Sequence, residues 1–364
     1  MRHTGQIRTG TDQTSTNRRL RVGFVPLCDC APLVVAHEWG LFARHGLKVE
    51  LVREVGWATV RDKLIHGDLE AAHALAGMPF AAALGVGSIV CPSLTALVLN
   101  RQGNAIAIAR RLVDNGRLDA AAFGEQCRRK PPAEPLVFGV VSLVSSHRYL
   151  MECWLNQAGL RPEQDYRLAA VPPPQMPDLI RGGHLAGFCV GEPWCSVAVE
   201  QRLGCCVATS AEIAPGHPEK VLMVTDQFAS EHSEVHLRLV AAVLRACEIC
   251  AQPEHHPDIA RCLSGRRYVN APATLIQRSF GSGFSCADET DPPFTIYHGS
   301  GVNRPSAALG AWVFENLVSR QPAEPASALV KQVFREDLHE AALKLCESVH
   351  HQIEPVHETE SASV

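Results

Sequence analysis

The chain has 364 residues, which is enough for two domains with sizeable apolar cores. Apolar residues make up 46% of it and charged residues 20%, and this composition excludes an intrinsically disordered protein. With 34 basic and 38 acidic side chains, the net charge of -4 gives no basic field that would attract nucleic acid or an anionic membrane. No stretch offers about 18 uncharged apolar residues, so we expect no membrane-spanning helix.

The two ends of the chain and its cysteines indicate the compartment. Residues 1–19 are polar and lack the apolar core of a signal peptide, and we expect them and residues 348–364 to be disordered tails. The 14 cysteines lie in apolar runs such as Cys205-Cys206, where thiols serve as small hydrophobic groups. Such use fits a reducing compartment, so the sequence predicts a cytoplasmic protein.

The first part of the chain alternates extended and helical segments, which is typical of a parallel α/β sheet. A proline opens the first expected helix, and glycines close both helices. We expect strands at 21–27, 47–53, 69–73, 94–100 and 104–109, and helices at 32–44 and 57–66.

A proline-rich loop at 128–135 precedes a second α/β series. Its expected strands cover 136–143, 167–171 and 186–190, and its helices cover 145–158, 175–181 and 194 to about 204. From residue 221 the pattern is mainly helical, with helices expected at 234–250, 257–263, 272–280, 307–318 and 336–346 and a turn at 321–325. The series predicts two lobes, one made of 20–104 plus 218–347 and the other of 105–217.

Motifs for metal binding and catalysis are weak. Cys28-Asp29-Cys30 and the pair Cys247 and Cys250 lack the two C-x-x-C spacings of a zinc ribbon. The run 281–285 lacks the G-x-S-x-G order of a nucleophile elbow. The sequence therefore predicts no metal site, no cofactor and no enzyme activity.

Six turn motifs follow one another in a recognisable order. They read GWATVRDKL at 56–64, GMPFAAALG at 77–85, NRQGNAIAIA at 100–109, VPPPQM at 171–176, FCVGEPW at 188–194 and GHPEK at 216–220. Together they resemble the NrtA and CmpA family of nitrate- and bicarbonate-binding proteins of ABC importers. The resemblance implies an α/β, two-lobed periplasmic-binding-protein-like fold of type II, with a hinge about which the lobes close on a ligand.

Within that family the chain is most similar to the NasS group of cytoplasmic nitrate and nitrite sensors. Residues 27–47 and the asparagine of GNAIAIA, where transport members usually carry glutamine, strengthen this similarity. The resemblance implies that the unliganded protein sequesters a NasT-like RNA-binding antiterminator and that nitrate or nitrite releases it. Direct contact with nucleic acid or membrane is not implied.

The same resemblance assigns the residues that would hold the anion. Trp57 would donate its backbone amide at a helix N-terminus, and Asn104 would donate its side-chain amide. His147 lies at the start of a second helix, where the helix dipole and the exposed amides favour an anion. Gly191 would let a backbone amide approach the ligand, and Lys220 would supply the only full charge of the site.

Glu192 follows Gly191 and would repel an anion, so we expect it to brace a donor or the contact between the lobes. In bicarbonate binders a carboxylate can help hold a metal, and this role stays open for Glu192. Other readings also stay open: a transport binding protein for nitrate, bicarbonate or an alkanesulfonate, or an interaction module with a degenerate pocket. A thiamine-pyrimidine synthase shares the fold, but its CCCFC-like motif is absent.

Overall fold

The computed structural model describes residues 19–113, 118–130, 132, 134–281, 294–318 and 327–351. Residues 1–18 and 352–364, which make up most of the two expected tails, and the expected turn at 321–325 lie outside the described residues. Arg19 already belongs to the first strand, and the last helix continues to His351.

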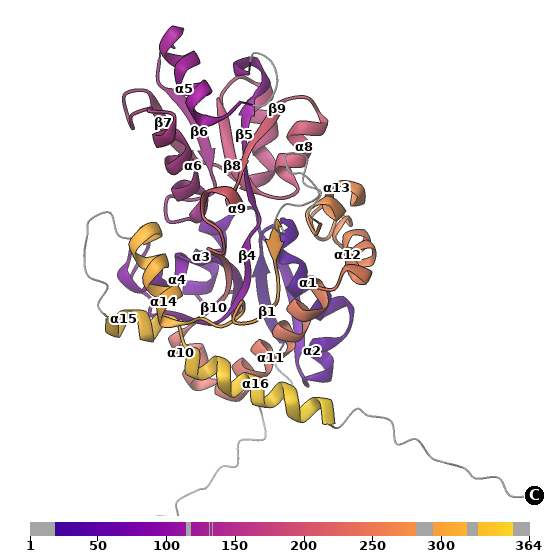
Figure 1. The fold of residues 1–364 in the computed structure, drawn as a ribbon. Helices are drawn as coiled ribbons and strands as arrows, with labels where there is room; N and C mark the ends of the chain where they lie inside the picture. The colour runs from indigo at the N-terminus through magenta and orange to yellow at the C-terminus, as the bar shows by residue number, and fades with distance from the viewer. Residues whose placement is uncertain are drawn as a thin grey trace, which may run out of the picture.

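The strands form two mixed sheets, which we call sheet A and sheet B (Figure 1). Sheet A has the order β11-β4-β10-β3-β1-β2, in which β1 is parallel to β2 and β3 while β10 is antiparallel to both of its neighbours. Its strands are β1 (Arg19–Phe24), β2 (Lys48–Arg53), β3 (Ala71–Leu75), β4 (Ser93–Gln102), β10 (Pro218–Thr225) and β11 (Thr295–Ile296).

Sheet B has the order β7-β6-β8-β5-β9. Strand β6 is parallel to β7 and β8, and β5 is antiparallel to β8 and β9. The strands are β5 (Asn104–Ala109), β6 (Leu136–Val140), β7 (Tyr166–Ala170), β8 (Gly187–Gly191) and β9 (Gly204–Thr209). The predicted α/β fold with two sheets is confirmed, whereas the predicted lobe boundaries stay a prediction.

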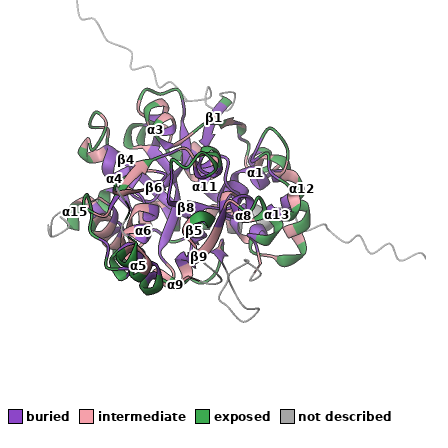
Figure 2. Ribbon diagram, turned by 90° about the horizontal axis from the view of Figure 1, so that it is seen from above, coloured by how far each residue is buried: buried purple, intermediate pink, exposed green. Residues whose placement is uncertain are grey.

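Helices cover both sheets, and their exposed residues lie on the periphery while the strands between them are buried (Figure 2). The helices before and within sheet B are α1 (Ala31–Glu38), α2 (Leu41–Arg44), α3 (Trp57–Ile65), α4 (Met78–Leu84), α5 (Ala120–Arg129), α6 (Ser146–Gln157), α7 (Met176–Arg181), α8 (Trp194–Glu200) and α9 (Ser210–Ile213). Those after β10 are α10 (Asp226–Glu231), α11 (Ser233–Cys250), α12 (His256–Leu263), α13 (Ala273–Arg278), α14 (Ala307–Val313), α15 (Ser327–Val333) and α16 (Glu336–His351).

Some expected elements differ from the structure. The helix expected at 32–44 is split into α1 and α2 because Gly40 adopts a left-handed φ of 73° between them. The mainly helical reading from residue 221 is wrong at its start, because β10 runs to Thr225 through the middle of sheet A. Strand β9 and helix α5 were not expected, and α5 occupies part of the expected loop at 128–135.

The chain crosses between the sheets twice. It leaves sheet A after β4 and enters sheet B at β5, with Gly103 alone between the two strands. It returns after α9 through residues 214–217 into β10. The ends of these crossing strands lie where the two sheets meet, and this junction contains the residues described next.

Candidate functional site

The structure brings the five predicted ligand residues together at the junction of the two sheets. Trp57 is the first residue of α3, Asn104 the first residue of β5, and His147 the second residue of α6. Gly191 ends β8, and Lys220 lies near the start of β10. The side chains of Asn104, His147 and Lys220 have no exposed surface, and Trp57 is 3% exposed. Their role in ligand binding stays a prediction.

The ammonium of Lys220 is the centre of this cluster. Its Nζ lies 2.8 Å from Oδ2 of Asp29 and donates to Oε1 of Glu219. It also lies over the indole ring of Trp57, 5.4 Å from the ring centroid, where a cation is attracted by the aromatic face. The expectation that Lys220 is the only full charge of the site is therefore wrong, because two carboxylates flank it.

A local irregularity of β10 explains how consecutive residues reach one site. Side chains of neighbouring residues in a regular strand point to opposite faces of the sheet. The pairing of β10 with β4 shifts register between Pro218 and Lys220 and again between Lys220 and Val221. Such a bulge turns a side chain away from its regular direction, and here Glu219 and Lys220 meet.

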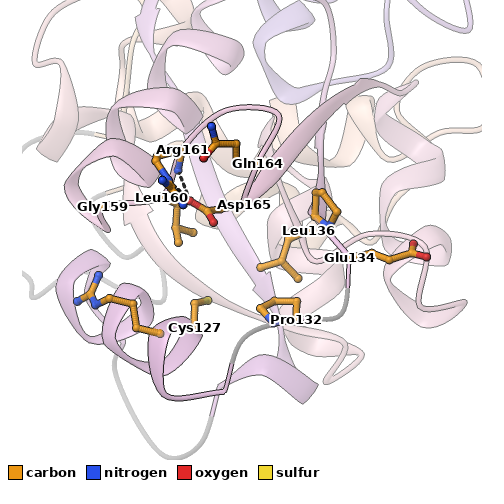
Figure 3. A pocket seen from close by; sticks show the side chains of 11 residues that line it. Cys127, Pro132, Glu134, Leu136, Gly159, Leu160, Arg161, Gln164 and Asp165 are labelled. Atoms are coloured by element: carbon orange, nitrogen blue, oxygen red, sulfur yellow. Dashed lines mark hydrogen bonds and ion pairs between the residues drawn. The ribbon is translucent and has the colours of Figure 1, made fainter.

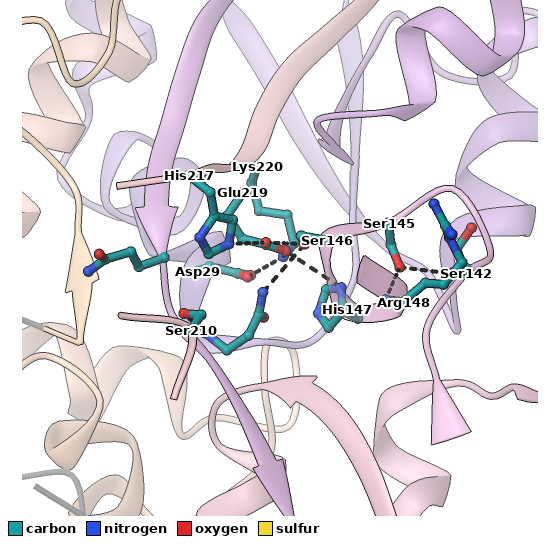
Figure 4. A network of polar contacts seen from close by, with 12 residues as sticks. Asp29, Ser142, Ser145, Ser146, His147, Arg148, Ser210, His217, Glu219 and Lys220 are labelled. Carbon is teal, nitrogen blue, oxygen red and sulfur yellow. Dashed lines mark hydrogen bonds and ion pairs between the residues drawn. The ribbon is translucent and has the colours of Figure 1, made fainter. Parts of the chain in front are cut away.

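Glu219 accepts contacts on both carboxylate oxygens (Figure 4). Besides Lys220, Oε1 lies 3.7 Å from Nδ1 of His147. The other oxygen, Oε2, accepts from the hydroxyl of Ser146 and lies 3.1 Å from Nε2 of His217. Ser146 and His147 begin α6, which packs against β6 and β8 of sheet B, whereas Glu219 belongs to β10 of sheet A. This carboxylate therefore links the two sheets.

Asp29 has a second partner on sheet A. Its Oδ1 lies 3.0 Å from Nε2 of His73, a fully buried residue of β3. Sequence reasoning missed Asp29, His73, Ser146, His217 and Glu219 as site residues. Asp29 lies in the run Cys28-Asp29-Cys30 and Glu219 in GHPEK, but only the bulge and the sheet contacts show that they reach Lys220.

The electrostatics of this cluster keep all three groups ionised. Burial alone would raise the pKa of Asp29 and Glu219, but Lys220 together with nearby histidines outweighs burial and lowers both pKa values. Burial alone would lower the pKa of Lys220, but the two carboxylates raise it. Burial lowers the pKa of His147 to about 4, although Glu219 acts in the opposite direction. Asp29 and Glu219 bring two negative charges to the cluster, and Lys220 brings one positive charge.

Several polar atoms around the cluster remain available to a ligand. Nε1 of Trp57, Nε2 of His147 and Oδ1 of Asn104 are buried and have no hydrogen-bond partner among the residues that the structure describes. The amide nitrogen of Asn104 lies 3.5 Å from the Ser146 hydroxyl. A Cβ added at Gly191 would lie 3.2 Å from a methyl carbon of Leu27 and 3.4 Å from both Asn104 Oδ1 and Asp29 Oδ2, so glycine lets these groups pack closely against the end of β8.

Glu192 lies beside the cluster and at a contact between the two sheets. Its backbone carbonyl accepts a 2.7 Å hydrogen bond from the amide of Cys28, and its carboxylate accepts from the amide of Ser196 at 3.2 Å. Two residues further along the chain from Glu192, Nε1 of Trp194 donates to the carbonyl of Pro26 at 3.0 Å. Burial raises the pKa of Glu192 to about 7.

The described residues outside this cluster offer no better candidate site. In the described part of the chain, no group of three or more His, Cys, Asp or Glu side chains is placed to hold a metal ion. A hollow of about 470 Å³ lies between α5, β6 and the loop at 159–165, lined in part by Cys127, Leu136 and Asp165 (Figure 3). None of the predicted ligand residues lines it, and Asp165 is bound to Arg161 at 3.1 Å.

A sequence model of the NMT1-like family matches residues 13–264, which is more than half of the chain. The chain belongs to the NMT1-like family. The predicted similarity to binding proteins of the NrtA and CmpA type is confirmed at this level.

Curated relatives of this NMT1-like chain are named for nitrate and bicarbonate. The nitrate import ATP-binding protein NrtC of Synechocystis is 37% identical over 82% of the chain, and the bicarbonate transport ATP-binding protein CmpC of Synechococcus elongatus is also 37% identical over 82%. The alignments cover 45% and 44% of these relatives, so the chain spans somewhat less than half of their length. The nitrate/nitrite binding protein NrtA of Nostoc is 30% identical over 72% of the chain and is covered over 61%.

Solved structures show the same fold. The periplasmic nitrate-binding protein NrtA from Synechocystis matches with a TM-score of 0.83 at 26% identity, covering 92% of this chain and 91% of that one. The alkanesulfonate-binding protein SsuA from Xanthomonas axonopodis matches with a TM-score of 0.60 at 15% identity, covering 88% and 97%. The predicted periplasmic-binding-protein-like fold is thereby confirmed.

Proposed function

We propose that the protein binds nitrate and nitrite at the Lys220 cluster and acts as a cytoplasmic sensor of these anions, without enzyme activity. The observation that carries the proposal is the fully buried ammonium of Lys220 at the junction of the sheets, next to the N-terminus of α6. The names of the relatives NrtC and NrtA support nitrate and nitrite as ligands.

The chemistry of the cluster suits a small planar anion. Nitrate spreads one negative charge over three oxygens and needs converging donors together with a cation in a site closed to water. Lys220 is the cation. Unpaired ring nitrogens lie nearby on Trp57 and His147, and Asn104 carries a side-chain amide. With four heavy atoms and roughly 1.5 kcal/mol per atom, we expect a binding free energy of about 6 kcal/mol and a Kd of tens of micromolar.

The proposed cytoplasmic location rests on the cysteines. Cys28, Cys30, Cys247 and Cys250 are free thiols that lie buried in one apolar core. Unpaired thiols in a core are typical of a reducing compartment. None of the helices that the structure describes has the length and apolarity for crossing a membrane.

The proposed signal is release of a NasT-like antiterminator. A ligand buried between two sheets cannot touch a partner, so it must act by changing how the sheets lie against each other. Nitrate should then lower the affinity for the antiterminator by the factor by which the antiterminator lowers the affinity for nitrate. Co-purification with and without millimolar nitrate tests this step, and a complex that survives nitrate would contradict it.

Bicarbonate binding is the second candidate. It is favoured by the similarity to CmpC and to the bicarbonate-binding protein CmpA of Synechococcus elongatus, which is 28% identical over 71% of the chain. Bicarbonate is also a planar monoanion, so the shape of the Lys220 cluster does not discriminate between nitrate and bicarbonate. A transport role is the corresponding alternative to sensing.

Calorimetry of the purified chain with nitrate, nitrite, bicarbonate and sulfate tests the ligand. We expect heat of binding with nitrate and nitrite and little with sulfate, because a tetrahedral dianion has twice the charge and a different shape. Binding of bicarbonate without nitrate would replace the first candidate by the second.

A further inference from the structure

The surroundings of the Glu219 carboxylate are those of a bound ligand. Its side chain is completely buried, and both oxygens are contacted. The contacting groups are the ammonium of Lys220, the hydroxyl of Ser146 and the imidazoles of His147 and His217. Ser146 and His147 belong to α6 beside sheet B, and Lys220 belongs to β10 of sheet A, so the partners of this carboxylate come from both sides of the junction.

The same groups are the ones that a free oxyanion would use. An ammonium, a hydroxyl and imidazoles next to the N-terminus of a 12-residue helix favour a planar group with negative oxygens. A carboxylate has that shape, as nitrate, nitrite and bicarbonate do. The side chain of Glu219 therefore already contacts the groups that the anion would need for binding.

The charges around Glu219 make simultaneous occupation unfavourable. Lys220 is its only cationic partner on β10, and Asp29 already shares that ammonium. His147 on α6 and His217 before β10 contact Glu219, and Cys189 on β8 lies close enough to interact with it. Burial keeps the imidazole of His147 and the thiol of Cys189 neutral at neutral pH. A second anion would thus compete with two buried carboxylates for one ammonium.

We propose that Glu219 is a built-in ligand, which holds the two sheets together in the absence of a free anion and which the anion must displace in order to bind. The inference rests on the proposed function, because it concerns the same site. It assigns to Glu219 a role in setting both the affinity for the anion and the shape of the unliganded protein.

The test compares wild-type protein with Glu219→Gln, which keeps the size of the side chain and removes its charge. Nitrate is titrated into each protein by calorimetry at pH 7, after circular dichroism has shown that the variant is folded. We expect Glu219→Gln to bind nitrate at least about tenfold more tightly, because the ammonium of Lys220 no longer has to break an ion pair with residue 219 before it binds the anion. Glu234→Gln is the matched control, because this carboxylate has 74% of its side chain exposed and pairs with Arg238 of the same helix, α11, and it should leave the affinity unchanged.

The outcomes separate this inference from the proposed function. If wild-type protein binds nitrate and Glu219→Gln binds it equally or more weakly, the built-in ligand is refuted and nitrate binding stands. If wild-type protein and Glu219→Gln both bind bicarbonate alone, the ligand assignment fails, and the change in bicarbonate affinity decides the role of Glu219. If no anion binds to either protein, both proposals are refuted.

A second measurement needs no ligand. Small-angle X-ray scattering of the anion-free proteins should give a larger radius of gyration for Glu219→Gln than for wild type, because the contact of Glu219 with α6 is weakened. Glu234→Gln should match wild type, because its ion pair with Arg238 lies within α11. Equal radii for all three proteins would show that Glu219 does not hold the sheets together.

Discussion

The ammonium of Lys220 lies between the carboxylates of Asp29 and Glu219, and all three groups are buried. A buried charge is tolerated because it is paired, and removal of one member leaves the others without compensation. Lys220 therefore contributes to the stability of the protein as well as to the proposed site. Sequence reasoning could not separate these two contributions, because it placed no carboxylate at the ammonium.

We predict that Lys220→Met abolishes nitrate binding and lowers the free energy of unfolding by roughly 3 to 5 kcal/mol, since two buried carboxylates lose their cation. Urea denaturation at pH 7 measures the change. Adding Asp29→Asn to the same protein should restore part of the stability but not the binding. Lys344→Ala, at an exposed residue of α16, is the control, and a loss of stability equal to that of Lys220→Met would contradict the explanation.

The carboxyl group of Glu192 gives a prediction for pH. Its pKa is raised to about 7 by burial, from an ordinary value of 4.5, so the folded protein binds this proton more tightly than the unfolded chain does. The stability from the protonated form is therefore complete below pH 4.5 and is lost as the pH rises to about 7.

We predict that Glu192→Gln raises the stability relative to wild type by about 3 kcal/mol at pH 8 and by little at pH 4.5, because the amide does not ionise. Thermal unfolding at the two pH values measures the difference. Glu234→Gln, at an exposed carboxylate of α11, should show no such change with pH. A Glu192→Gln protein that is stabilised equally at both pH values would contradict a raised pKa.

At the scale of elements, two neighbouring serines at the N-terminus of α6 have different roles. The hydroxyl of Ser145 accepts from the amide of Arg148 at 3.3 Å and donates to the carbonyl of Ser142 at 2.6 Å, so it caps the helix (Figure 4). Ser146 and His147 instead turn toward Glu219. The cap fixes where the helix begins and thereby which residues reach the cluster.

We predict that Ser145→Ala lowers the free energy of unfolding by about 1 kcal/mol, the usual cost of losing a helix cap, and changes nitrate affinity less than about twofold. Denaturation and calorimetry on one preparation test both statements. Ser306→Ala removes the corresponding cap of α14, where the hydroxyl accepts from Leu309 at 3.3 Å, and should cost a similar amount. A large loss of affinity in Ser145→Ala would show that the cap itself positions the site.

At the scale of the whole molecule, the two crossing segments decide how the sheets can move. Gly103 between β4 and β5 has a φ of 97°, and a Cβ at this position would lie 2.8 Å from Oγ1 of Thr295 in β11. Only glycine adopts such a backbone conformation without strain. The hinge implied by the family resemblance would act at this crossing and at residues 214–217.

We predict that Gly103→Ala costs roughly 1 to 3 kcal/mol of stability, because alanine is strained at this φ and crowds Thr295. It should also shift nitrate affinity, since the angle between the sheets changes. Gly216→Ala is the informative partner, because its φ of 71° lies in the second crossing while no atom would lie within 4 Å of the new Cβ. If Gly103→Ala is no less stable than Gly216→Ala, crowding by Thr295 is unimportant.

The sequence by itself determined the alternation of strands and helices and the residues at the starts of α3, α6 and β5. These follow from local rules: apolar runs, prolines and glycines at helix ends, and serine at a helix cap. The turn motifs added the family resemblance and with it the predicted positions of Trp57, Asn104, His147, Gly191 and Lys220. Where local signals were ambiguous, as in the apolar run Val221–Val224 of β10, a strand was missed at the start of a stretch that was expected to be mainly helical.

Only the tertiary structure decided the charge of the site. Asp29 and Glu219 contact Lys220, and His73 of β3 contacts Asp29, while a bulge in β10 directs two consecutive residues to one place. Neither effect has a local pattern, because strand pairing joins residues that are far apart in the chain and a change of register depends on the neighbouring strand. An ammonium that the sequence presents as a free cation is therefore paired in the folded protein, since burial of an unpaired charge is too costly.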